Sequence, residues 1–251
     1  MLKRVFLFLV FSHSIYAADN QLPHSLKFIQ KQGGEVVESF NAPSGMTGYI
    51  VEFRGNALTV YLTEDEQYLF TGKMLDATGR DIGEEALEGY INGPQSEKKW
   101  QALRSSNWIP DGSEDAEKVI YTFSDPNCPY CKKFWENARP WVASGEVQIR
   151  HILVGILKAD SYGKSAAILS AKDPAEALYE HQASENGSVR PLTSPSETVR
   201  TQLEENHLLM QTLGISAVPA IYYKDKTNAL KLHMGLPGAL QLEQIMSSKG
   251  D

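Results

Sequence analysis

The chain has 251 residues and a net charge of −7, and 42% of its residues are hydrophobic. That apolar fraction supports one large or two modest folded domains and argues against a disordered chain. The negative charge argues against nucleic acid as a partner, because binding to a phosphate backbone depends on basic side chains.

The first residues have the features of a secretory signal peptide. Lys3 and Arg4 are followed by an apolar run over residues 5–11 and then by the small residue Ala17. The run is too short to span a bilayer, which disfavours the alternative of an uncleaved membrane anchor. We therefore expect residues 1–17 to be cleaved during export, into a compartment where disulfides persist.

Short apolar or alternating segments follow, separated by turn-forming residues. Residues 23–34 predict a short amphipathic helix that ends at a glycine pair. Residues 84–108 predict a connecting helix that should break or kink at Pro94, because proline removes a backbone donor. A domain boundary is expected within residues 80–110. Between the two helices, the β-forming segments predict a small antiparallel sheet of three to five strands: EVVESF, GYIVEF, ALTVYL and QYLFTGKML.

The second half of the chain alternates strands and helices, which is the order of an α/β domain. Residues 119–124 (VIYTFS) predict a buried strand, and a helix that contains Pro140 is expected directly after it. Residues 146–157 predict a second buried strand, and residues 160–213 are mostly helical in period. The segments that complete the domain are two strands joined by a short turn, AVPAIYYKD and ALKLHMGLP, and a closing helix, GALQLEQIMSS.

Two cysteines, Cys128 and Cys131, are the only ones in the chain, and they lie in the segment SDPNCPYCKKFW. They enclose almost no loop, so a disulfide between them would add little stability as a structural crosslink. A zinc site usually needs four ligands, and no spacing specifies a cysteine nucleophile with a histidine base. The histidines considered as ligands show no paired spacing: His151, His181, His207 and His233. The sequence therefore favours a redox pair.

The predicted position of the cysteine pair suits thiol chemistry. Cys128 is expected at a helix start, where backbone N–H groups and the positive helix end stabilise an anion and lower the pKa of the thiol. Because the thiolate is the form that attacks disulfides, we expect Cys128 to be the exposed, reactive thiol. Cys131 lies on the same helix face, shielded, and could attack the mixed disulfide. Pro219 precedes a predicted strand, where a cis bond costs little, although trans is commoner.

The motifs DPNCPYCKKFW, VPAIYY and GLP resemble those of periplasmic thioredoxin-fold proteins of the DsbC/DsbG family. The resemblance also covers FNAPSGMTGYI, LTVYLT and KKWQALRSSNWIPDG, and so nearly the whole mature chain. Pro129, rather than glycine, between the cysteines favours the DsbG branch. The resemblance implies an α+β dimerisation domain with a small, cystatin-like antiparallel sheet (residues 18–80), a linker helix (residues 81–106), and a thioredoxin-like α/β domain with a helical insertion (residues 107–251).

The resemblance further implies roles for individual residues and for the whole protein. Cys128 would be the attacking thiol, Cys131 the resolving thiol, and Pro219 a cis-proline beside them. No cofactor is implied beyond the redox-active disulfide between the two cysteines. The protein would be a periplasmic homodimer that isomerises or reduces disulfides of exported client proteins and is kept reduced by the membrane protein DsbD. It could also reduce sulfenic acids on single client cysteines, because a sulfenic acid condenses with a thiol.

One position departs from the family pattern. The family has threonine before the cis-proline, and this chain has Val218, as DsbA oxidants do. Two other functions therefore stay open: a DsbA-like thiol oxidant, which the N-terminal half opposes, and a redox-independent holdase chaperone that binds unfolded clients. A variant that lacks both cysteines separates the chaperone from the two redox functions, because only a redox-independent chaperone would keep full activity without them.

Overall fold

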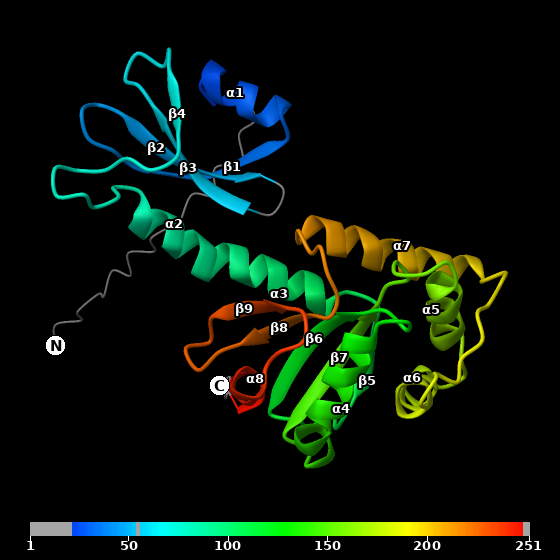
Figure 1. The fold of residues 1–251 in the computed structure, drawn as a ribbon. Helices are drawn as coiled ribbons and strands as arrows, with labels where there is room; N and C mark the ends of the chain where they lie inside the picture. Colours follow the sequence, from blue (N-terminus) through cyan, green and yellow to red (C-terminus); the bar gives the residue numbers. More distant parts are fainter. Residues whose placement is uncertain (1–21, 54–55, 248–251) are drawn as a thin grey trace, which may run out of the picture.

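The computed structural model describes residues 22–53 and 56–247 of the chain (Figure 1). The expected signal peptide, residues 1–17, lies outside the described residues. Two β-sheets lie at opposite ends of a helical segment, the first with four strands and the second with five. Within the described ranges, every helix is too short or too polar to cross a bilayer.

The N-terminal unit consists of one helix and an antiparallel sheet in the order β1-β2-β3-β4. Its elements are α1 (His24–Lys31), β1 (Gly34–Asn41), β2 (Thr47–Phe53), β3 (Asn56–Leu62) and β4 (Leu69–Thr71). The hydrophobic cluster between helix and sheet centres on Leu26, Val51 and Val60. The predicted helix and the predicted small antiparallel sheet are confirmed, although β4 is shorter than the segment QYLFTGKML.

The linker between the two sheets remains helical through Pro94. Helix α2 (Glu84–Tyr90) passes through a π-helical turn, η1 (Ile91–Gln95), into α3 (Ser96–Arg104), and Figure 1 shows a continuous helical segment. The helix was expected to break or kink at this proline, and it does not break there. A π turn is wider than an α turn, so it accommodates a residue that lacks the usual backbone donor.

The two ends of the linker pack on different sheets. Tyr90, the last residue of α2, donates a hydrogen bond of 2.7 Å from its hydroxyl to Glu52 in the N-terminal sheet. In α3, the ring of Trp100 packs edge-to-face on Tyr121 at 5.0 Å between centroids. Leu103 is fully buried in a cluster of the second sheet. The linker helix therefore contacts both units and contributes Leu103 to the core of the second.

The C-terminal unit is a mixed sheet in the order β5-β7-β6-β8-β9. Its strands are β5 (Trp108–Asp111), β6 (Lys118–Ser124), β7 (Val147–Leu153), β8 (Ala220–Lys224) and β9 (Leu230–Met234). Strands β6 and β7 run parallel, and the other neighbouring pairs are antiparallel. The buried strand over residues 119–124 and the late hairpin are confirmed.

Helices cover both faces of this sheet. They are α4 (Pro129–Ala143), α5 (Ser161–Leu169), α6 (Pro174–Ala183), α7 (Glu197–Thr212) and α8 (Ala239–Ser247). Side chains alternate along β6, so Ile120 packs with residues of α4 and α8. On the other face Tyr121 shares a cluster with Leu103 of α3 and Met210 of α7. Helices α5 to α7 form the expected helical insertion between β7 and β8.

Two features of this sheet differ from the sequence analysis. Strand β5 was missed because its first residue, Trp108, was expected to end the connecting helix, which ends at Arg104, and because Pro110 argues against a strand. Here it is an edge strand, where a missing ladder donor is tolerated. Strand β7 ends at Leu153 rather than at residue 157, because the N–H groups of Ile156 and Leu157 bond to the Asp125 carboxylate instead of a neighbouring strand.

Candidate active site

Cys128 occupies the N-cap position of α4, directly after the loop that leaves β6. Its backbone is extended, with φ −84° and ψ 110°, and its Sγ accepts a hydrogen bond of 3.0 Å from the backbone N–H of Cys131. Pro129 takes the first helical position, where a missing N–H costs nothing. The two cysteines form a disulfide whose Cα atoms are 5.2 Å apart. The sulfur of Cys128 thus lies where unpaired helix N–H groups favour negative charge.

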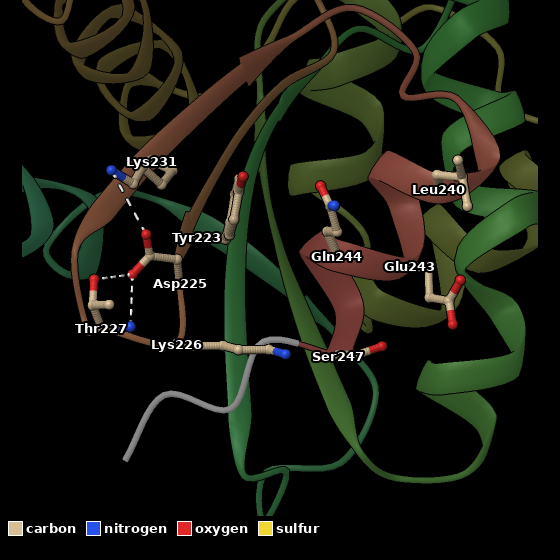
Figure 2. A pocket seen from close by; sticks show the side chains of 9 residues that line it. All are labelled: Tyr223, Asp225, Lys226, Thr227, Lys231, Leu240, Glu243, Gln244 and Ser247. Carbon is tan, nitrogen blue, oxygen red and sulfur yellow. Dashed lines mark hydrogen bonds and ion pairs between the residues drawn. The ribbon is translucent and has the colours of Figure 1, made fainter.

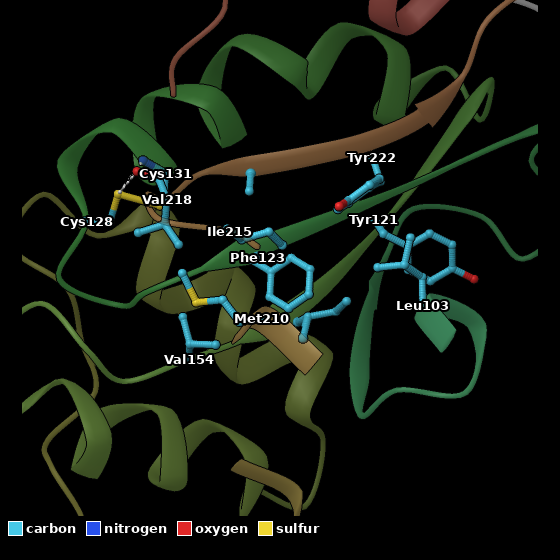
Figure 3. Close-up of a cluster of buried hydrophobic side chains, with 12 residues drawn as sticks. Leu103, Tyr121, Phe123, Cys128, Cys131, Val154, Met210, Ile215, Val218 and Tyr222 are labelled. Atoms are coloured by element: carbon cyan, nitrogen blue, oxygen red, sulfur yellow. Dashed lines mark hydrogen bonds between the residues drawn. A yellow bond between two sulfur atoms is a disulfide. The ribbon is translucent and has the colours of Figure 1, made fainter. Parts of the chain in front are cut away.

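Both cysteines are buried in this disulfide form. Cys128 is 3% exposed and Cys131 1%, so the expected contrast between an exposed and a shielded cysteine is absent. They share a hydrophobic cluster with Val218 and Val154 (Figure 3). The carbonyl oxygen of Val218 is 3.6 Å from Cys128 Sγ, so the loop before β8 covers the disulfide.

The residues expected at the site are therefore adjacent in space. The Val218–Pro219 peptide bond is cis, the isomer that the family resemblance implied. The carbonyl of Pro219 accepts a hydrogen bond of 2.7 Å from the Gly235 N–H, which fixes this loop against the end of β9. At the rim, the ring of Tyr130, between the two cysteines in sequence, is 60% exposed.

Asp125, a buried carboxylate directly after β6, was not predicted as part of the site. It organises the loop before Cys128 by accepting hydrogen bonds of 2.8 to 3.0 Å from the N–H groups of Asn127, Ile156 and Leu157 and from the Ser161 hydroxyl. The Asp-Pro pair before the cysteines is a local signal for such a turn. The contacts to residues 156–161 depend on the fold and carry no sequence signal.

Asn127, the residue before Cys128, is held by the insertion. Its amide donates hydrogen bonds of 2.9 Å to Asp160 and Ser161, and its side-chain oxygen accepts one of 2.8 Å from Lys164. Lys164 also pairs with Asp160 at 3.0 Å, and this contact is the main reason why the pKa of Asp160 is lowered. The positive charge of Lys164 and the negative charge of Asp160 therefore compensate each other beside the loop.

Two histidines lie near this loop. Burial lowers the pKa of His181 and of His207, which favours the neutral form of both rings. Both ring nitrogens of His181 are occupied, by the carbonyl of Pro126 and the N–H of Val189, and Nε2 of His207 accepts a bond from the Gly155 N–H. A histidine base for a cysteine nucleophile therefore has no support from His181. The helix N-terminus is the feature that favours a thiolate at Cys128.

Apart from the cysteine site, a surface depression lies at the far end of β8 and β9, and Figure 2 shows the side chains that line it. It measures about 660 Å³ and is bordered by the β8–β9 turn and by α8. Two carboxylates line it, Asp225 and Glu243, and Asp225 is already bonded to Thr227 and Lys231. Across residues 22–53 and 56–247, no group of three or more histidine, cysteine or acidic side chains is placed to hold a metal ion. The cysteine pair is thus the chemically distinctive site in the described part of the chain.

Comparisons with known proteins agree with this geometry. A family model for the thioredoxin-like domain matches residues 112–248. The chain is 42% identical over 233 residues to the thiol:disulfide interchange protein DsbG of Pseudomonas aeruginosa, which covers 92% of this chain and 91% of that protein. It is 39% identical over 252 residues to the protein of the same name from Escherichia coli K12, covering 99% of this chain and 100% of that one.

A solved structure resembles the C-terminal part of the chain. The catalytic domain of Proteus mirabilis ScsC superimposes with a TM-score of 0.51 at 23% identity and covers 60% of this chain and 93% of that one. Together with the family model over residues 112–248, this similarity supports the expected thioredoxin-like fold.

Proposed function

This chain belongs to the thioredoxin-like family, and within it to the thiol:disulfide interchange proteins of the DsbG type, and from that premise we propose that it isomerises and reduces disulfides of exported proteins in the periplasm. The main support is the position of Cys128 at the start of α4, with its Sγ bonded to the Cys131 N–H at 3.0 Å. In the reduced protein the same N–H can donate a stronger hydrogen bond to Cys128 Sγ, because the acceptor is then a charged thiolate.

The reaction begins from the reduced pair. The Cys128 thiolate attacks one sulfur of a client disulfide, so that a mixed disulfide forms and the other client sulfur leaves as a thiolate. In isomerisation, a client thiolate attacks the client sulfur of the mixed disulfide, which forms a new client disulfide and returns the Cys128 thiolate. In reduction, the Cys131 thiolate attacks Cys128 Sγ, which releases the reduced client and leaves the Cys128–Cys131 disulfide.

A sulfenic acid on a single client cysteine can enter the same cycle. The Cys128 thiolate attacks the sulfenic sulfur, hydroxide leaves, and the resulting mixed disulfide is resolved by Cys131 as before. Each reduction leaves the pair oxidised, so a donor of two electrons must restore it. We assign this role to the membrane reductant DsbD, and we assign no cofactor beyond the cysteine pair.

The domain arrangement fits this cycle. We propose that residues 18–80 form a dimerisation domain, that residues 81–106 link it to the catalytic domain of residues 107–251, and that residues 1–17 direct export. A homodimer would place two cysteine pairs near one client, which helps isomerisation because a freed client thiol stays close to the mixed disulfide.

Trapping of clients tests the proposal. A Cys131→Ala variant keeps the proposed attacking thiol and loses the resolving one, so it should accumulate client proteins linked through Cys128. Mass spectrometry of the adducts, released by a reductant, should identify exported proteins that contain cysteines. The control is Cys128→Ala, which should trap none. Equal trapping by both variants, or none by either, would refute the assignment.

A DsbA-like oxidant is the second candidate, because the residue before the cis-proline is Val218 rather than threonine, and Val218 packs in the cluster that contains Cys128. Acid-quenched thiol trapping of periplasmic extracts separates the two functions. A reductase or isomerase should be mostly reduced in cells, whereas an oxidant should be mostly in the disulfide form. A predominantly oxidised pool would therefore replace our proposal with the oxidant.

A further inference from the structure

The helical insertion holds each of the three residues that precede Cys128. Asp125 and Asn127 are bonded from the start of α5, as described above. The residue between them, Pro126, has no side-chain donor or acceptor, so only its carbonyl can be held. That carbonyl is 2.9 Å from Nε2 of His181, near the end of α6.

The hydrogen bonds of His181 define the state of its ring. The N–H of Val189 donates to Nδ1 at 3.3 Å, so Nδ1 is an acceptor and the ring proton lies on Nε2. Nε2 therefore donates to the Pro126 carbonyl. The residue is only 3% exposed, and burial lowers the pKa of the ring, which favours this neutral form.

The segment of residues 181–189 also contacts the chain on the other side of Cys128. Lys132, one residue after Cys131, directs its ammonium group at the backbone carbonyls of Ser184 and Glu185. The segment therefore fixes α4 just after the cysteines and the loop just before them. This double contact makes the position of the Cys128 sulfur depend on the insertion.

Gly187 shows how closely this segment is packed on the histidine. A Cβ added there would lie 2.4 Å from Cε1 of His181, so any side chain must displace the ring. Gly145 offers a matched site, because its φ of +82° resembles the +74° of Gly187 and an added Cβ would meet nothing within 4 Å. Alanine at the two positions carries the same backbone strain but affects the ring at only one of them.

We propose that His181 is a positioning residue for the thiol reaction: by donating from Nε2 to the Pro126 carbonyl, it holds the sulfur of Cys128 over the N-terminus of α4. The proposal rests on the proposed function, in which Cys128 is the attacking thiol. Removal of the donor should let the loop move and weaken the bonds that stabilise the thiolate. The thiolate would then form at higher pH, and the variant would become less oxidising, because its reduced form loses stability relative to the disulfide.

The test is an ultraviolet titration of the thiolate in the reduced, full-length protein. His181→Leu removes the donor and should raise the midpoint by ~0.5–1 pH unit, which corresponds to roughly three- to tenfold less thiolate below the midpoint. At a pH above the midpoint, where the reduced form is the thiolate, the equilibrium with glutathione should shift by the same factor. His181→Gln retains a side-chain N–H donor and should recover part of the shift. Gly187→Ala should reproduce the shift of His181→Leu, and Gly145→Ala should titrate like the wild type.

Two results would overturn the proposal. One is an unchanged midpoint in a folded His181→Leu protein, or in Gly187→Ala if the leucine variant does not fold. The other is equal behaviour of His181→Leu and His181→Gln, which would indicate a purely structural role. Alkylation of the reduced wild type separates this failure from that of the proposed function, because labelling first at Cys131 would contradict the function itself.

Discussion

The two sheets of this protein differ in how much of their apolar surface is buried. The C-terminal sheet has extensive clusters on both faces, and one of them contains the cysteine pair. The N-terminal unit has a small cluster, and four of its large apolar side chains are more than half exposed: Phe28, Tyr68, Phe70 and Leu75. The larger C-terminal unit has the same number, but they are spread one to a helix over α4, α6, α7 and α8: Tyr130, Tyr179, Leu208 and Leu240. A rigid core suits a site that must hold a sulfur in place, whereas a small core with apolar surface suits assembly.

Removal of the N-terminal unit should have the largest effect. The full-length protein should have twice the monomer mass by light scattering, because the exposed apolar residues and the edge strand β4 can be covered by a second copy. A fragment that starts at Ser96 keeps Trp100 and Leu103, so it should remain folded but be monomeric. A monomeric full-length protein, or a dimeric fragment, would contradict this division of roles.

Two fully buried leucines on helices sharpen the comparison. Leu26 belongs to the N-terminal cluster and Leu103 to the cluster that contains the cysteines. Leu26→Ala and Leu103→Ala should each cost about 2–5 kcal/mol of the free energy of unfolding of the unit concerned. Denaturant unfolding combined with alkylation should show altered Cys128 reactivity in Leu103→Ala alone. Equal changes in reactivity would mean that the two cores are not independent.

The two units should also differ in their response to acid. Burial alone would raise the pKa of Asp111, but the bonds from His151 and Arg139, the latter 2.9 Å between Nη1 and Oδ1, outweigh it and hold this pKa well below its usual range. A lowered carboxyl pKa contributes stability that is present above the unfolded value of about 3.9 and is lost as pH falls through the folded pKa. Asp111→Asn should therefore cost stability at pH 7 and much less at strongly acidic pH.

The expected cost of Asp111→Asn at pH 7 is roughly 2–3 kcal/mol, between the values for exposed and buried pairs, because the Arg139 side chain is 25% exposed. The control is Asp76→Asn, on the N-terminal side of the linker. Hydrogen bonds from the Thr78 hydroxyl and from backbone N–H groups lower the pKa of Asp76 to about 2, but the Asp76 side chain is more exposed than that of Asp111, at 26% against 12%. Unfolding curves across pH should show the smaller effect for Asp76→Asn.

The smallest effect is expected from Val218→Thr. Val218 packs in the cluster with both cysteines, so a threonine hydroxyl could donate to the Cys128 thiolate. A bond worth about 1 kcal/mol would lower the pKa of that thiol by ~0.5–1 unit. The variant should then be more oxidising, since its reduced form is stabilised. An unchanged or raised pKa by ultraviolet titration would mean that the hydroxyl bonds elsewhere and that Val218 only packs.

Local signals in the sequence were sufficient for part of this structure. The cysteine pair at a helix start follows from a β-rich segment, an Asp-Pro turn and Pro129, which are all adjacent in the chain. The π turn at Pro94 and the proline-containing edge strand β5 were missed, because their stability comes from packing that outweighs local propensity. Asp125 and His181 were missed as parts of the site because the contacts that decide it are with residues more than 30 positions away, Ile156 for Asp125 and Pro126 for His181.

The central claim is that Cys128 is the attacking thiol although both cysteines are almost equally buried in the disulfide form. Brief alkylation of the reduced protein at neutral pH, followed by peptide mapping, tests it directly. Labelling should occur first at Cys128, with at least about tenfold preference, because the helix N-terminus stabilises its thiolate. Equal labelling of the two cysteines, or preferential labelling of Cys131, would contradict the claim.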